Sequence, residues 1–222
     1  MSAARQPVVT KPDDTRASDD TKGRLLKAAI EVFSEKGFEA STIREICSRA
    51  GANVALIHYH FGDKLELYTE VLRHSMSCGA PSPPPANVPL TDPEQALRFV
   101  VGAMVERVLQ TGGQADLRYR LMLHEFAHPS TATARVVQEV MRPMYDRLRE
   151  IVGAILGLPP DHEKTRLSVH SVIGQIAYYA KSAPMLRTLW PEMKMDQAQR
   201  TQIAVHITEF SLAYLRRTRP PP

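Results

Sequence analysis

Apolar residues repeat with the period of an α-helix along most of the chain, and this pattern excludes most other folds. The repeat begins after Thr21, where apolar side chains lie three and four residues apart, at Leu25, Leu26, Ala29, Ile30 and Phe33. Similar spacing continues over residues 93–112, 161–182 and 196–216. No segment shows the convincing alternation of a strand. The sequence therefore predicts an all-α fold of about nine helices.

Length and composition are those of an ordinary globular protein. The 222 residues are 43% hydrophobic and 23% charged, enough for one domain of usual size or two small ones. No apolar run reaches the roughly 18 to 20 residues of a membrane span, and residues 1–20 lack an apolar signal core, so we expect a cytoplasmic protein without membrane contact. Two cysteines are too few for a disulfide framework. The net charge of +4 suits an anionic partner without identifying one.

The chain divides at a proline-rich stretch. Residues 1–20 are polar and aperiodic, which predicts a disordered N-terminal arm. Residues 21–77 hold four helical segments, the proline-rich loop 78–93 follows, and 94–217 form a C-terminal helical domain. Within that domain we expect one helix over 131–157, kinked at Pro143.

Local signals within residues 21–77 predict a helix-turn-helix. Gly37 ends the first helix, and Thr42 with Glu45 forms a capping box for a short second helix that stops at Gly51. Residues 54–61 make another short helix, after which Asp63 caps a fourth. Two short helices joined by a tight glycine turn place the second one where it can enter the major groove of DNA.

Several motifs make the resemblance to a known family specific. Residues 21–70 resemble the DNA-binding domain of the TetR/AcrR family in order and spacing, and the stretch from Gly51 to Lys64 is most similar to its CecR-like branch. The matching positions are Leu25-Leu26-x-Ala28-Ala29, Phe33, Gly37-Phe38, Ser41-Thr42-Ile43, Ile46, Ala50-Gly51, Tyr59-x-Phe61 and Lys64-x-x-Leu67. The second half resembles the same branch at Glu125-Phe126-x-x-Pro129, Arg142-Pro143, Leu156-Gly157-Leu158-Pro159 and Gly174-Gln175-x-x-x-Tyr179.

The resemblance implies a homodimeric transcriptional regulator with no enzymatic activity and no cofactor or metal. Such proteins are usually repressors, and a small molecule bound in the C-terminal domain lowers their affinity for DNA. The family also suggests control of efflux or transport genes, with an activator or dual regulator as the alternative. Its partners would be double-stranded DNA with an inverted-repeat operator, a small effector and a second copy of the chain.

The DNA-binding residues follow from the matching positions. Thr42 and Lys64 match phosphate-contacting positions, and Tyr59 and His60 match backbone contacts. The positions that match base-edge contacts are Arg44, Val54, Ala55, Leu56 and His58, and Asn53 at the start of the reading helix completes the set. The alternative is that Tyr59 packs in the core and the histidines are merely exposed. His58 departs from the tyrosine usual in the family, as Cys47 and Ala52 depart from alanine and valine.

The C-terminal domain supplies two further sets of candidates. An apolar effector pocket is expected to be lined by Phe99, Met104, Tyr119, Met122, His124, Phe126, Tyr145, Gln175, Tyr178 and Met185. The last two helices are expected to pair with their copies across a two-fold axis, through Val169, Ile173, Ile176, Ile203, Ile207, Phe210 and Tyr214. We expect the effector signal to pass from the sixth helix to the fourth.

Three enzyme or metal interpretations compete with this one. His124-Glu125-x-x-His128 spells the HExxH pattern of a zinc hydrolase, but Pro129 ends the helix there and no third-ligand motif follows. His58 and His60 lie two residues apart on a helix and so point in different directions. No GxSxG motif indicates a serine hydrolase. Regulation therefore remains the favoured function, with a zinc hydrolase as a remote alternative.

Overall fold

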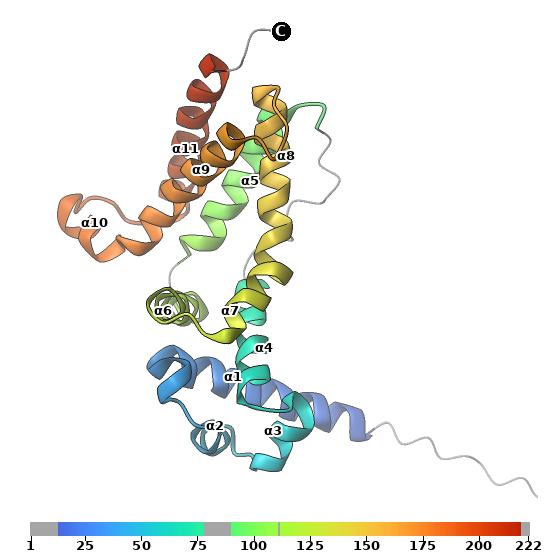
Figure 1. Ribbon diagram of the computed structural model, residues 1–222. Coiled ribbons are helices and arrows are strands. Elements are labelled where there is room, and N and C mark those ends of the chain that lie inside the picture. The colour runs from blue at the N-terminus through green and yellow to red at the C-terminus, as the bar shows by residue number, and fades with distance from the viewer. Residues whose placement is uncertain (1–12, 78–89, 111, 219–222) are drawn as a thin grey trace, which may run out of the picture.

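The computed structural model describes residues 13–77, 90–110 and 112–218, and within these ranges it contains only helices and their connections (Figure 1). The expected all-α fold is confirmed. The described residues form eleven α-helices and one π-helical turn. None of these helices has the length and apolar character needed to cross a bilayer.

The first four helices are α1 (Asp13–Ala40), α2 (Ile43–Ala50), α3 (Val54–Phe61) and α4 (Lys64–Ser77). Gly37, at φ 74°, breaks α1 near its end, as the sequence predicted. The side chains of Thr42, Asn53 and Asp63 accept hydrogen bonds from backbone N–H groups at the starts of α2, α3 and α4, at 3.2, 3.1 and 2.9 Å.

The predicted disordered arm is wrong in its second part. α1 begins at Asp13, so residues 13–20 are helical. That stretch contains neither proline nor glycine, and apolar periodicity marks only the part of a helix that packs. Residues 1–12 of the arm, and residues 78–89 of the proline-rich loop, lie outside the described ranges.

The second half contains α5 (Pro93–Val108), α6 (Gln114–Ala127), α7 (Thr131–Val136), the π-helical turn η1 (Val137–Met141), α8 (Arg142–Leu156), α9 (Glu163–Lys181), α10 (Ala183–Leu189) and α11 (Gln197–Thr218). The expected helix over 131–157 is continuous from Thr131 to Leu156, because the residues where α7, η1 and α8 join all have helical φ and ψ. The π-helical turn lies just before Pro143, where the proline lacks an N–H and its ring disturbs the α-helical hydrogen bonds.

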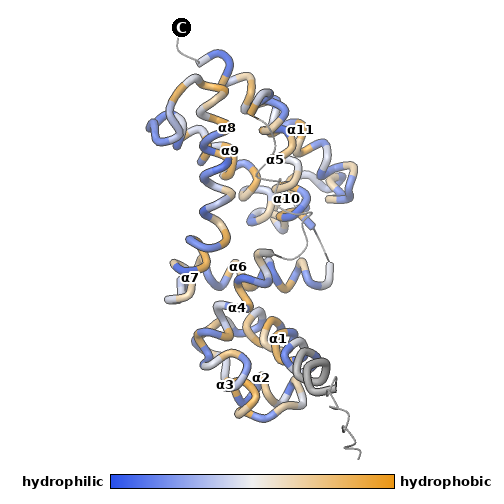
Figure 2. The backbone as a smooth tube through the Cα atoms, turned by 90° about the vertical axis from the view of Figure 1, so that its right-hand side faces the viewer, coloured by the Kyte–Doolittle hydropathy of each residue, from blue (hydrophilic) through white to orange (hydrophobic). Residues whose placement is uncertain are grey.

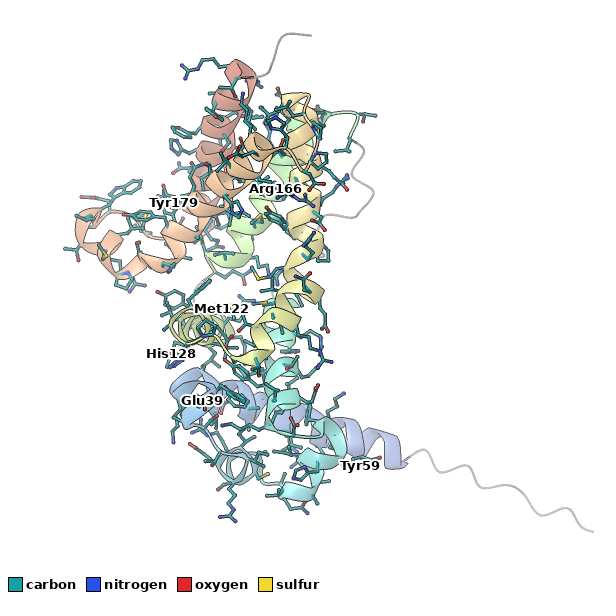
Figure 3. All side chains as sticks on the ribbon, in the orientation of Figure 1. Glu39, Tyr59, Met122, His128, Arg166 and Tyr179 are labelled. Carbon is teal, nitrogen blue, oxygen red and sulfur yellow. The ribbon has the colours of Figure 1, made fainter. Side chains whose placement is uncertain are left out.

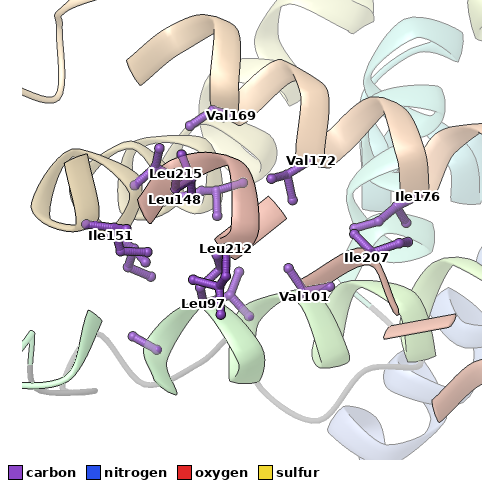
Figure 4. Close-up of a cluster of buried hydrophobic side chains, with 14 of the residues drawn as sticks. Leu97, Val101, Leu148, Ile151, Val169, Val172, Ile176, Ile207, Leu212 and Leu215 are labelled. Atoms are coloured by element: carbon purple, nitrogen blue, oxygen red, sulfur yellow. The ribbon is translucent and has the colours of Figure 1, made fainter. Parts of the chain in front are cut away.

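Two separate hydrophobic cores organise these helices. The upper core in Figure 1 is formed by α5, α8, α9 and α11, and Figure 4 shows its interleaved aliphatic side chains, among them Leu97, Ile151 and Leu212. The lower core joins α1–α4 with Leu121 of α6 and with Ala132 and Val136 of α7. In Figure 2, α6 and α7 lie between the end that holds α1, α2 and α3 and the end that holds α5, α8, α9 and α11.

The lower core changes two expectations. Residues 94–217 were expected to pack as one C-terminal domain, yet α6 and α7 share the core of α1–α4. α6 packs chiefly against α1, and α7 packs along α4, so the expected contact of the sixth helix with the fourth is the smaller one. Helical periodicity shows that a helix has an apolar face but not which neighbour covers it.

Four of the seven residues expected at the dimer interface are instead buried inside the protomer. Val169, Ile176, Ile203 and Ile207 belong to the upper core, and Ile173 packs against it. Phe210 and Tyr214 are exposed, with 62% and 46% of their surface accessible. The apolar stripes of α9 and α11 are broad enough to serve the protomer core on one side and a partner on the other, and the sequence does not separate the two.

Candidate nucleic-acid interface

The helix-turn-helix is formed by α2 and α3, which lie with α1 at one end of the molecule (Figure 1). Ile46 of α2 and Ile57 of α3 are fully buried against α1 and α4. Gly51 makes the turn at φ 60° and ψ 41°, the left-handed conformation that glycine adopts without strain. Burial of one side of each helix fixes which side of α3 faces outward.

The outward side of α3 carries Val54, Ala55, His58 and Tyr59, all of which are exposed. Tyr59 has 78% of its surface accessible and projects from the helix (Figure 3). The alternative that Tyr59 packs in the core is therefore wrong. Leu56, in contrast, is half-buried and packs against the lower core, which leaves it less available to a base than the sequence suggested.

Two arginines of α2 differ in their availability. The guanidinium of Arg49 donates two hydrogen bonds to the carboxylate of Glu35 on α1, at 2.7 and 3.0 Å, and these hold the pKa of Glu35 below its ordinary value. Arg44 is exposed, and no hydrogen bond or ion pair occupies its guanidinium within the part of the chain that the structure describes. Arg44 is thus available for a ligand outside the protomer.

The two N-cap residues keep hydrogen-bonding capacity toward a phosphate. The Thr42 oxygen accepts from the backbone N–H of Glu45, so its own hydroxyl hydrogen can still be donated. The side-chain oxygen of Asn53 accepts from the backbone N–H of Leu56, which leaves its NH₂ group as a donor. Both lie at helix N-termini, where the helix dipole favours an anion.

Lys64 is more constrained than its expected phosphate contact implied. Its ammonium lies 4.5 Å from the centre of the Phe38 ring and donates to the backbone carbonyl of Glu39 at 3.4 Å. These contacts tie the start of α4 to the end of α1. No sequence signal pointed to them, because the residues are 25 or 26 positions apart.

His58 makes a contact that the sequence did not predict. Its Nδ1 lies 2.6 Å from the backbone carbonyl oxygen of Gly62, and the backbone N–H of Gly62 in turn donates to the carbonyl of His58 at 3.1 Å. Gly62 has φ 88° and ψ −83°, a conformation that side chains other than glycine rarely adopt. The end of α3 is thereby closed by two reciprocal hydrogen bonds.

Comparison with known families decides the identity of this fold. A model of the tetR family of bacterial regulatory proteins matches residues 25–71, and a model of the C-terminal domain of the transcriptional dual regulator CecR matches residues 93–215. The chain belongs to the TetR family. It is a DNA-binding transcription regulator whose second half is of the CecR type.

Individual relatives agree with this assignment. The regulator is 26% identical to the dual regulator CecR of Shigella flexneri over 86% of this chain and 90% of CecR. It is 39% identical to the transcriptional repressor NicS of Pseudomonas putida, over 38% of this chain and 40% of NicS. The fatty acid degradation regulator FadR from Bacillus halodurans shares the fold, with a TM-score of 0.62 at 17% identity over 94% and 99% of the two chains.

The expected effector residues of this TetR-family protein are distributed over the two cores and the exposed surface. Met122 packs on the lower core, whereas Met104 and Tyr145 pack on the upper one. Gln175 donates to Ser211, and Tyr119 donates to the backbone carbonyl of Lys181. Four others, Phe99, Phe126, Tyr178 and Met185, are exposed. His124 lines an open hollow of about 380 Å³ between α1 and α6, with Ser34, Glu35, Arg120 and Leu123.

The HExxH residues do not form a metal-binding arrangement. Only 7% of the surface of Glu125 is accessible, and its carboxylate accepts hydrogen bonds from Tyr68 and Ser130. His128 is the C-cap residue that follows the last helical residue of α6, and it is exposed to solvent (Figure 3). Among the described residues no group of three or more His, Cys, Asp or Glu side chains could hold a metal ion.

Proposed function

We propose that this regulator is a repressor that binds an inverted-repeat operator as a homodimer and leaves it when a small, largely apolar molecule binds. The observation that carries the proposal is the exposed face of α3 beside the unoccupied guanidinium of Arg44. In this arrangement α3 enters the major groove, Arg44 reads a guanine, and the N-termini of α2 and α3 contact phosphates.

The dimer would form through α9 and α11. These helices expose large apolar side chains on the side away from the upper core: Leu167, Tyr178, Val205, Phe210 and Tyr214. A two-fold axis between paired copies of these helices makes the interface self-complementary and repeats α3 on the same side of the DNA. The simplest spacing of the two reading helices is about one turn of DNA, roughly 34 to 36 Å.

The effector would act on the position of the lower core relative to the upper one. α6 meets the end of α9 through two contacts, the hydrogen bond from Tyr119 to the carbonyl of Lys181 and the Lys181 ammonium 5.0 Å from the Phe126 ring. Because α6 and α7 share a core with α1–α4, a ligand that changes this junction would move α3 with them. Such a ligand lowers DNA affinity only to the extent that it prefers the displaced arrangement.

A dual regulator is the second candidate, and transport or efflux genes are the proposed targets. The alternative is favoured by the CecR-type second half, since one relative that matches along most of the chain is a dual regulator. A reporter gene placed behind the selected operator distinguishes the two. A repressor lowers expression or leaves it unchanged at every operator position, whereas a dual regulator raises it at some positions.

Selection of bound duplexes from a random DNA pool tests the core of the proposal. The purified protein should enrich an inverted repeat, and its affinity for that repeat should fall steeply with salt because phosphate contacts release counterions. Enrichment of a single half-site would contradict the dimeric arrangement. Binding that depends on salt but enriches no sequence would contradict specific recognition.

A further inference from the structure

We propose that His58 reads an exocyclic amino group, on adenine or cytosine, through its Nε2 atom, and so sets the base preference at one position of each half-site. This inference rests on the proposed insertion of α3 into the major groove. It specifies that His58 is the acceptor in this contact and the base is the donor, because the structure fixes which ring nitrogen can accept a hydrogen bond.

The hydrogen bond to Gly62 determines the position of the proton on the ring. The partner of Nδ1 is a backbone carbonyl oxygen 2.6 Å away, and a carbonyl oxygen can only accept. Nδ1 must therefore carry the hydrogen. In the neutral ring the second nitrogen, Nε2, is then a hydrogen-bond acceptor without a hydrogen.

The local backbone maintains this tautomer. The φ of 88° at Gly62 turns its carbonyl back toward the last turn of α3, and no heavy atom lies within 4 Å of the place a Cβ would occupy. The N–H of Gly62 is bonded to the carbonyl of His58, which fixes the loop that carries the acceptor. His58 itself is exposed on the outward side of α3, and within the described ranges no partner is assigned to Nε2.

An acceptor at this place distinguishes bases in the major groove. The donors presented there are the N6 amino group of adenine and the N4 amino group of cytosine, whereas guanine N7 and O6 and thymine O4 are acceptors. Nε2 of neutral His58 can pair with either amino group but meets an acceptor at guanine or thymine. Arg44, a pure donor, has the opposite preference, so the two side chains would read different bases.

Selection from a random pool with the wild type and His58→Phe tests the inference, with Tyr59→Phe as the matched control. Phenylalanine keeps an aromatic ring and removes both nitrogens. We expect the wild type to prefer adenine or cytosine at one position per half-site, by roughly threefold to tenfold, and His58→Phe to lose that preference alone. Tyr59→Phe removes a hydroxyl assigned to the DNA backbone, so it should retain this base preference even where its overall affinity falls.

Other outcomes overturn the inference. A lost preference for guanine or thymine means that His58 donates rather than accepts. Equal weakening on all sequences, with a smaller salt slope, means that it contacts a phosphate. Nitrogen-15 spectra of the free protein, assigned with the same variant, should show the hydrogen on Nδ1, and a hydrogen on Nε2 contradicts the proposal. A wild type that enriches no sequence overturns the proposed function as well, whereas the first two results overturn this inference only.

Discussion

The carboxylate of Glu125 is the point at which three helices of the lower core meet. It accepts a hydrogen bond from the Tyr68 hydroxyl of α4 at 2.6 Å, from the Ser130 hydroxyl at 3.2 Å and from the Thr133 hydroxyl of α7. A buried carboxylate is tolerated only when its oxygens are satisfied. Burial, and then this hydrogen bond, raise the pKa of the Tyr68 hydroxyl, so the tyrosine stays a donor.

Tyr68→Phe should therefore destabilise the protein although it removes a single oxygen. The variant leaves one carboxylate oxygen of Glu125 without its buried donor, and we expect the free energy of unfolding to fall by about 1 to 3 kcal/mol. Urea denaturation measures the change. Tyr59→Phe, at an exposed site, is the control and should unfold like the wild type. Equal stability of the two variants would mean that the hydrogen bond to Glu125 contributes nothing.

Arg44 and Lys64 should differ in how their loss affects DNA binding. Arg44→Ala is expected to cost about 1 to 3 kcal/mol at one operator position and to relax the preference there, because its unoccupied guanidinium can pair with guanine. Lys64→Ala should weaken binding evenly across sequences and also loosen the contact with Phe38. Titration of the selected operator and its single-base variants separates the two. Unchanged base preferences in Arg44→Ala would assign Arg44 to a phosphate.

Between elements, the close packing of α1 against α6 places Gly37 of α1 directly beside His124 of α6. A Cβ on Gly37 would lie 3.0 Å from Nδ1 of His124. Gly37 also has φ 74° with ψ −178°, a region that is essentially restricted to glycine. The break in α1 and the close packing of α6 against it therefore both require that residue 37 has no Cβ.

Gly37→Ala should cost more stability than Gly51→Ala. Both glycines have positive φ, but Gly51 lies in the ordinary left-handed region with no atom within 4 Å of a Cβ. We expect Gly51→Ala to lower the free energy of unfolding by about 1 to 2 kcal/mol and Gly37→Ala to exceed that. Adding His124→Ala should recover the steric part only at Gly37. A double-mutant cycle without coupling would show that the close approach has no energetic effect.

Elements defined by local signals could be predicted from the sequence, and those defined by distant contacts could not. Thr42 and Asp63 cap helices where their sequence context predicts, and Gly37 and Gly51 interrupt them as expected. The burial of Val169 in the protomer and the packing of α6 on α1 both depend on neighbours far along the chain. The outward face of α3 could be predicted because Ile57 marks its buried side.

In the candidate site, too, the sequence predicted features set by local motifs and did not predict those set by contacts between distant residues. The exposure of Tyr59 and of Arg44 agrees with the positions that the family motif assigned to DNA. Periodicity alone did not indicate that Lys64 is held by Phe38, or that the apolar residues proposed for an effector pocket are divided between two cores. Such facts depend on which of several apolar faces meet, and many pairings are compatible with one pattern.

The whole molecule consists of two cores joined through α4, α7 and α8. Ion pairs link α4 to α7 and to η1. Arg73 of α4 donates to Glu139 of η1 at 2.6 and 3.1 Å, and Arg135 of α7 donates to Glu66 of α4 at 2.8 and 3.0 Å. These pairs link the same elements that pack together, since α7 and η1 both contact α4. The DNA-binding end therefore includes α7, and relative motion is expected between the cores rather than within the lower one.

A charged pair of substitutions on α11 tests the dimeric arrangement. Phe210→Glu with Tyr214→Glu places two carboxylates on the proposed two-fold face, where burial without partners costs several kcal/mol. Sedimentation at micromolar concentration should show the wild type as a dimer and the double variant as a monomer, which corresponds to at least a hundredfold weaker association at about 2.7 kcal/mol. Because both side chains are exposed in the protomer, its thermal unfolding should otherwise remain that of a folded chain.

The double substitution on α11 should also weaken binding to the operator. A monomer binds one half-site, so the affinity for the inverted repeat should fall to that for an isolated half-site, while the base preferences within the half-site persist. Met141→Glu, an exposed apolar position on η1, is the matched control and should remain dimeric with full affinity. A double variant that still sediments as a dimer would place the two-fold contact on another surface and would remove the basis for the predicted spacing of the two α3 helices.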